Sequence, residues 1–145
     1  MDSTLKYYNQ NADQFVQETL SVDFKQTQDR FLAKLSVGAY ILDFGCGSGR
    51  DTKYFLENGY QVDAADGSEE LCKIASDYTG IKVKQMLFGE LCDVDKYDGI
   101  WACSSILHLS KDTLADVLKK MTAALKDSGV IYTSFKYGEF EGERN

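Results

Sequence analysis

Short apolar runs alternate along the chain with segments of helical periodicity, and this alternation constrains the fold more than any other feature. The runs of strand character cover residues 39–44, 61–66, 81–86, 97–103 and 129–135. The first, fourth and fifth runs are almost continuously apolar, which is typical of strands covered on both faces of a parallel sheet. The pattern predicts a three-layer α/β domain with a parallel sheet and right-handed crossovers.

The ends of the helices between these strands carry recognisable signals. The run from Arg50 has helical propensity and stops at Gly59, a suitable C-terminal residue. Ser68 and Ser110 are suited to cap the next two helices, because a serine hydroxyl accepts a hydrogen bond from a free amide of the first turn. One or two further helices are expected within residues 12–36. The connection after the third strand has little helical periodicity, so we expect a short helix or an irregular crossover there.

Length and composition are those of an ordinary globular chain. We expect residues 1–145 to form one domain, with a helical N-terminal segment of about residues 1–36. No apolar run approaches the roughly 18 residues of a membrane-spanning helix, and the polar N-terminus has no apolar signal core. A cytoplasmic protein with reduced cysteines and no membrane contact is therefore expected.

Charge and cysteine usage exclude two further classes of partner. The formal net charge of −7 argues against nucleic acid as a partner, since phosphate groups are bound by basic surfaces. The four cysteines form no C-x-x-C pair and the chain has one histidine, so no metal site is expected.

The stretch ILDFGCGSGRDTKYF, residues 41–55, places three glycines at alternate positions between the first strand and the first helix. In a doubly wound sheet this turn lies at the carboxyl ends of the strands, where ligands bind. Glycine suits it because the chain turns sharply and a Cβ would hinder close approach of a ligand. A dinucleotide site requires G-x-G-x-x-G, but Gly49 comes one residue early and Arg50 takes its place. A nicotinamide-dependent oxidoreductase is therefore disfavoured.

The pattern D-x-G-x-G-x-G from Asp43 to Gly49 resembles motif I of the class I S-adenosylmethionine-dependent methyltransferases. The segments YYNQNADQF, ILDFGCGSGRDTKYFLENGYQVDAADGS, YDGIWACSSILHLS and SFKYGEFEGERN are together similar to small bacterial methyltransferases of the tellurite-resistance type. This resemblance covers nearly the whole chain. It implies a Rossmann-like fold with parallel strand order 3-2-1-4-5, S-adenosylmethionine as cofactor, and methyl transfer. One departure is visible, at residues 125–129, where L-K-D-S-G replaces the family's L-K-P-G-G.

The resemblance implies a cofactor site built from the loops at the ends of four strands. Asp66, at the end of the second strand, is implied to accept hydrogen bonds from both ribose hydroxyls. Apolar side chains after the third strand suit the adenine face, and residues after the fourth strand would border the methionine end. The candidate cofactor-binding residues are Asp43, Gly45, Cys46, Gly47, Ser48, Gly49, Arg50, Asp66, Gly67, Ser68, Met86, Leu87, Phe88, Cys103 and Ser104.

Several of these residues have alternative roles that the sequence leaves open. Asp66 could cap the following helix, and Arg50 could pair with the cofactor's carboxylate or form a surface salt bridge. Asp43 lies in an apolar strand and needs partners, which the glycine-loop amides or the cofactor's amino group could supply. His108 could act as a general base, although a local packing role is favoured, so no catalytic residue is assigned. Methyl transfer from a sulfonium needs no essential base, since positioning and desolvation supply much of the catalysis.

The sequence gives least information about the part of the protein that would bind the methyl acceptor. Family members continue with two antiparallel strands, whereas this chain ends at residue 145, shortly after the expected fifth strand. We expect the final antiparallel strands to be missing, and the fifth strand to be an exposed edge through which the chain could self-associate. The predicted function is methyl transfer to a small-molecule acceptor. The alternative is a truncated cofactor-binding fragment or regulatory module without turnover.

Overall fold

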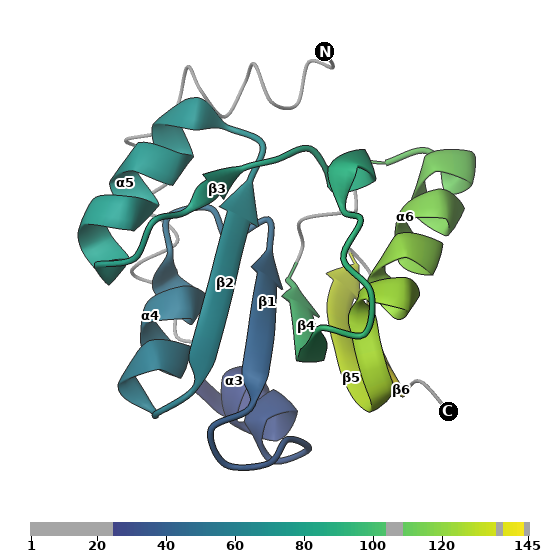
Figure 1. Ribbon diagram of the computed structural model, residues 1–145, viewed down its shortest axis with the longest axis horizontal. Coiled ribbons are helices and arrows are strands. Elements are labelled where there is room, and N and C mark those ends of the chain that lie inside the picture. The colour runs from purple at the N-terminus through teal and green to yellow at the C-terminus, as the bar shows by residue number, and fades with distance from the viewer. Residues whose placement is uncertain (1–24, 104–108, 136–137, 144–145) are drawn as a thin grey trace.

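The structure is a computed structural model that describes residues 25–103, 109–135 and 138–143. Its elements follow one another as α3 (Lys25–Leu32), β1 (Tyr40–Phe44), α4 (Arg50–Glu57), β2 (Gln61–Asp66), α5 (Glu69–Thr79), β3 (Lys84–Gln85), the 3-10 helix η1 (Phe88–Glu90), β4 (Tyr97–Ala102), α6 (Lys111–Ala124), β5 (Leu125–Phe135) and β6 (Gly138–Glu143) (Figure 1). The strands occur where the sequence predicts them, although β3 is shorter than expected and β5 begins earlier. Of the expected N-terminal helical segment, α3 is the part that lies within the described residues.

The sheet has the order β3-β2-β1-β4-β5-β6, and its first five strands run parallel. The predicted parallel order 3-2-1-4-5 is therefore confirmed. β1 lies between β2 and β4, so its carboxyl end meets theirs at one edge of the sheet. Within the described residues, no helix combines the length and apolar character needed to cross a bilayer.

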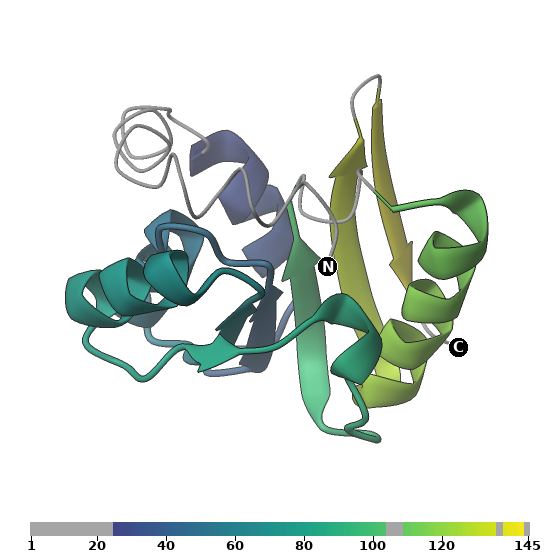
Figure 2. The same ribbon diagram turned by 90° about the horizontal axis from the view of Figure 1, so that it is seen from above.

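Helices cover both faces of the sheet, which gives the predicted three layers (Figure 2). Successive side chains of β1 point to opposite faces, as in any strand. Leu42 packs with Val117 and Met121 of α6, whereas Ile41 packs with Phe55 of α4 on the other face, where α3 also lies. These side chains are almost fully buried, which explains why the sequence of the strand is continuously apolar.

The helix ends behave as their sequence signals predict. The Ser68 hydroxyl accepts a hydrogen bond from the Leu71 amide at the start of α5, and Gly80 ends that helix with φ +82°. The Ser110 hydroxyl accepts one from the Thr113 amide at the start of α6. The connection from β3 to β4 contains the short helix η1, as expected from its weak periodicity.

The expectation that the final antiparallel strands are missing is wrong for one strand. β6 pairs antiparallel with β5, from Phe135 opposite Gly138 to Val130 opposite Glu143. Residues 138–143, G-E-F-E-G-E, alternate glutamate with glycine or phenylalanine, and a period of two residues is typical of a strand. β5 consequently has a neighbour on both sides, and the expected self-association through an exposed fifth strand loses its physical basis.

The departure from the family motif, at residues 125–129 in the first part of β5, falls on a strained residue. Ser128 has φ +66°, a left-handed conformation that costs a residue with a side chain about 1–2 kcal/mol. It stands where the ladder between β4 and β5 shifts register, between the pairs Tyr97 with Leu125 and Gly99 with Val130. This irregularity of the ladder is at the amino end of β4, so the departure leaves the glycine loop unaffected.

The three glycines of the turn between β1 and α4 all have left-handed backbones. Their φ values are +83° at Gly45, +57° at Gly47 and +93° at Gly49. Gly49 is also restricted by packing, because a Cβ there would lie 2.8 Å from Thr79 Cγ2 and 3.2 Å from Ala75 Cβ. The third glycine therefore allows α4 to begin close against α5, a requirement separate from ligand access.

Replacing Gly49 by alanine should lower the free energy of unfolding by about 2–5 kcal/mol. About 1–2 kcal/mol comes from the left-handed backbone and about 1–3 kcal/mol from overlap with α5. Gly59→Ala is the matched control, since Gly59 has φ +91° but no atom of the described residues lies within 4 Å of the added Cβ. Urea unfolding of both variants should show the smaller loss for Gly59→Ala. Equal losses of unfolding free energy in the two variants would mean that overlap with α5 contributes nothing to the loss in Gly49→Ala.

Candidate cofactor site

The glycine loop, residues 45–49, is fastened to the end of β2 through its backbone. The amides of Gly45 and Cys46 both donate to the Ala65 carbonyl, at 2.8 and 2.9 Å. The Gly49 amide donates back to the Cys46 carbonyl at 3.1 Å. The loop is therefore preorganised by main-chain contacts at the carboxyl ends of β1 and β2.

The Asp66 carboxylate ties the glycine loop to the loop that follows β2. Its Oδ2 accepts a hydrogen bond from the Gly47 amide and its Oδ1 one from the Ser68 amide, both at 2.9 Å. Burial raises the pKa of Asp66, while the two amides act in the opposite direction. Ser68 itself caps α5, so the alternative role of Asp66 as a helix cap does not hold.

The surroundings of Asp66 fit a ribose. An ionised carboxylate offers about four acceptor positions, and the two amides take one on each oxygen. Each oxygen can therefore also accept a hydroxyl hydrogen, as a vicinal diol requires. The Met86 amide donates to the Asp66 carbonyl at 2.9 Å, which brings the segment after β3 beside the same residue.

The three candidate adenine-binding residues differ in how much apolar surface they expose. Met86 and Phe88 are half-buried and pack against the core under α6, where Phe88 meets the Phe44 ring edge-on at 4.9 Å between centroids. Leu87 is 42% exposed, and its amide donates to Glu90 Oε1 at 2.7 Å. Leu87 is therefore the one that offers a large apolar side chain to a ligand.

Asp43 is a buried carboxylate that binds a hydroxyl group. It is 1% exposed, and the Thr52 hydroxyl donates to its Oδ2 at 2.6 Å. Burial, together with the negative charge of Asp51, raises the pKa of Asp43 well above its usual 3.8, while Thr52 and Arg50 act in the opposite direction. Of the glycine-loop amides considered as its partners from the sequence, those of residues 45, 46, 47 and 49 donate to other acceptors.

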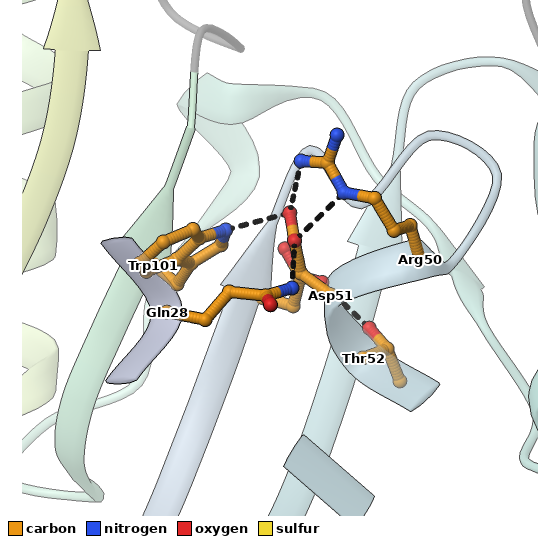
Figure 3. A network of polar contacts seen from close by, with 6 residues as sticks. Gln28, Arg50, Asp51, Thr52 and Trp101 are labelled. Carbon is orange, nitrogen blue, oxygen red and sulfur yellow. Dashed lines mark hydrogen bonds and ion pairs between the residues drawn. The ribbon is translucent and has the colours of Figure 1, made fainter. Parts of the chain in front are cut away.

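A third buried carboxylate, Asp51, gathers four N–H donors (Figure 3). Its Oδ1 accepts from Gln28 Nε2 at 2.6 Å and from Arg50 Nε at 2.9 Å. Its Oδ2 accepts from Arg50 Nη2 at 2.9 Å and from Trp101 Nε1 at 2.8 Å. Arg50 thus forms a bidentate ion pair with its own neighbour, in a largely buried position, and the surface salt bridge considered from the sequence is not what the structure shows.

The remaining candidates lie around the same edge of the sheet. Cys46 and Ser48 are buried within the glycine loop, and burial raises the pKa of the Cys46 thiol well above its usual 9.0, which keeps the thiol protonated. Gly67 joins Asp66 to the α5 cap, and half-buried Cys103 follows β4. Ser104 and His108 lie outside the described residues. In the part of the chain described, no group of histidine, cysteine or acidic side chains is arranged to hold a metal ion.

Sequence reasoning missed four residues that shape this site. They are Gln28, Asp51, Thr52 and Trp101, which come from α3, α4 and β4. One signal existed, since a buried indole N–H needs a hydrogen-bond partner. An aspartate in the first turn of a helix is ordinarily explained by the helix dipole, so nothing local marked Asp51 as that partner.

Comparison with known proteins decides the family. Residues 41–129 match a family described as "Methyltransferase domain", and this match spans the glycine loop, Asp66 and β4. The chain belongs to this methyltransferase family. S-adenosylmethionine is the cofactor that membership implies, in agreement with the resemblance found in the sequence.

Curated relatives share part of the sequence, and solved structures share the fold. The chain is 32% identical over 100 residues to N-terminal Xaa-Pro-Lys N-methyltransferase 1 of Xenopus tropicalis, covering 63% of this chain and 45% of that protein. A TehB-like S-adenosylmethionine-dependent methyltransferase from Corynebacterium glutamicum has a similar fold, with a TM-score of 0.73 and 22% identity over 94% of this chain and 74% of the other. The methyltransferase in a complex with the Haloferax volcanii activator Trm112 is also similar, with a TM-score of 0.75 and 22% identity. The similarity covers 90% of this chain and 60% of the other. The chain spans between 30% and 45% of the length of these curated relatives.

Asp43→Asn should make the stability of the methyltransferase less sensitive to pH. Because the pKa of Asp43 is raised on folding, the folded chain holds this proton more tightly than the unfolded chain does. The stabilisation that Asp43 contributes is complete below the pKa that it has in the unfolded chain. It is lost as the pH rises through the pKa that Asp43 has in the folded chain. Asparagine can still accept from Thr52 but cannot ionise. Urea unfolding between about pH 4 and about pH 8 should show a smaller fall for the variant. Asp77→Asn, on the exposed side of α5, is the control, and identical slopes for Asp43→Asn and wild type would contradict the prediction.

Proposed function

We propose that this methyltransferase binds S-adenosylmethionine between the glycine loop and Asp66, and that the whole protein transfers its methyl group to a small-molecule acceptor. The observation that carries the proposal is the Asp66 carboxylate, which joins the Gly47 and Ser68 amides at the carboxyl end of β2 and can still accept from a ribose diol. A cytoplasmic location is part of the same proposal.

Each neighbour of the loop would hold one part of the cofactor. Asp66 would accept the ribose hydroxyls, and the exposed side chain of Leu87 would contact the adenine face. The guanidinium of Arg50 would face the methionine carboxylate, beside Cys103. When bound, the cofactor supplies a methyl group on a sulfonium, already activated for displacement. The chain's contribution is to orient that group and exclude water from it.

The hydrogen bonds of the loop argue against a dinucleotide. A pyrophosphate is bound by free backbone amides at the start of a helix. The amides of Gly45, Cys46, Gly47 and Gly49 instead donate to protein acceptors. The buried groups around the loop include the carboxylates of Asp43, Asp51 and Asp66 beside one guanidinium, an arrangement that favours a ligand carrying a sulfonium and an ammonium over one carrying two phosphates.

Binding of S-adenosylhomocysteine tests the cofactor. Calorimetry should detect S-adenosylhomocysteine but not NAD, and Asp66→Ala should weaken the binding by about 1–3 kcal/mol through lost hydrogen bonds to the carboxylate. Asp63→Ala is the matched control, because Asp63 lies on the same strand but bonds the Tyr97 hydroxyl away from the site. An unchanged affinity in Asp66→Ala would remove this residue from the site, and a folded wild-type chain that binds NAD alone would overturn the proposal.

Methyl transfer tests the activity and the class of acceptor. The whole protein is incubated with labelled cofactor and a panel of small acceptors, and with a peptide beginning Xaa-Pro-Lys, since one relative is named for that substrate. Label on a small acceptor supports the proposal. Label on the peptide alone would mean that the acceptor is a peptide and not a small molecule. Cofactor binding without any transfer would favour the alternative, a cofactor-binding module without turnover.

A further inference from the structure

The buried carboxylate of Asp51 needs an explanation beyond stability. A buried ion pair is weak evidence for stabilisation, because the cost of desolvating both charges offsets their attraction. The side chain of Asp51 is 9% exposed and that of Arg50 is 17% exposed, so both groups are largely withdrawn from water. The pair is held in one geometry, since both carboxylate oxygens bond the guanidinium fork.

The partners of Asp51 are themselves rigidly held. Trp101 in β4 is fully buried, with its ring stacked on Tyr132 at 4.3 Å and lying edge-on to Phe55 at 5.4 Å between centroids. Its indole N–H therefore points in a fixed direction. Gln28 of α3 is 4% exposed and donates to the other carboxylate oxygen. Contacts from two elements far apart in the sequence thus fix the carboxylate, and the carboxylate fixes the plane of the guanidinium.

The guanidinium that this network orients lies at the edge of the sheet where the proposed cofactor would bind. Arg50 is the first residue of α4, directly after the glycine loop, and its charge acts on Asp43 and Cys103. In Figure 3 its side chain folds back over the carboxylate of Asp51. A guanidinium held in one plane is suited to bind a carboxylate through two parallel hydrogen bonds.

We propose that Asp51 is a positioning residue that, held by Gln28 and Trp101, orients the Arg50 guanidinium to recognise the carboxylate at the methionine end of the cofactor. This inference rests on the proposed function, because it assigns a subsite within the same cofactor site. In this arrangement, selectivity for the amino-acid end of the ligand depends on the hydrogen bond from Gln28 of α3, a helix that precedes the sheet in the sequence.

The test compares two ligands that differ at the methionine end. S-adenosylhomocysteine carries the amino and carboxylate groups, and 5′-methylthioadenosine lacks both. Asp51→Asn replaces one acceptor oxygen by an N–H2 group that opposes the donors around it. We expect the dissociation constant for S-adenosylhomocysteine to rise by about 10- to 100-fold, while that for 5′-methylthioadenosine changes by less than about twofold. Equal losses for both ligands would indicate a structural role and overturn the inference.

Two further variants keep the inference testable if Asp51→Asn does not fold. Gln28→Met removes one donor at similar volume and should reduce the preference for S-adenosylhomocysteine by about 2- to 10-fold. Arg50→Met should abolish the preference, and combining it with Gln28→Met should cause no further loss. Additive losses in the double variant would contradict action through Arg50. If wild type binds neither ligand, the proposed function fails and the inference with it; if it binds both but Gln28→Met keeps the full preference, the inference alone fails.

Discussion

The hydrogen bond between the Gly47 amide and the Asp66 carboxylate is the contact on which the site depends. With the two loop amides that donate to the Ala65 carbonyl, it joins the β1–α4 turn to the end of β2. The same carboxylate accepts a hydrogen bond from the Ser68 amide, so the β1–α4 and β2–α5 connections meet at one side chain. Left-handed glycines make this geometry accessible, and the packing of Gly49 against α5 fixes the angle at which α4 leaves the loop.

Three buried carboxylates around the loop are compensated in three different ways. Backbone amides bind Asp66, a threonine hydroxyl binds Asp43, and a guanidinium with two neutral N–H groups binds Asp51. Burial, together with the negative charge of Asp51, raises the pKa of Asp43 well above its usual value, although the Thr52 hydroxyl acts in the opposite direction.

Local sequence patterns predicted most of the fold, but they could not predict contacts between residues far apart in the sequence. Apolar runs predicted the strands, serine and glycine signals predicted both ends of α5 and the start of α6, and the resemblance implied the strand order. β6 was missed because its short alternation of glutamate with phenylalanine lies past the expected end of the sheet. The bonds of Asp51 to Gln28 and Trp101 join residues 23 and 50 positions away, and hydrogen bonds of that range leave no periodic signature. The assignments of cofactor-binding residues stay predictions.

The most direct measurement is an amide chemical-shift titration of the isotopically labelled chain with S-adenosylhomocysteine. The account predicts that the largest shifts fall on the glycine loop, residues 45–49, and on Gly67 and Ser68. The amides of Asp95 and Lys96, which bond α6 carbonyls at the opposite edge of the sheet, should remain unchanged. Saturation by the ligand that leaves the glycine loop and Ser68 unshifted, while moving resonances at the opposite edge, would contradict the placement of the cofactor.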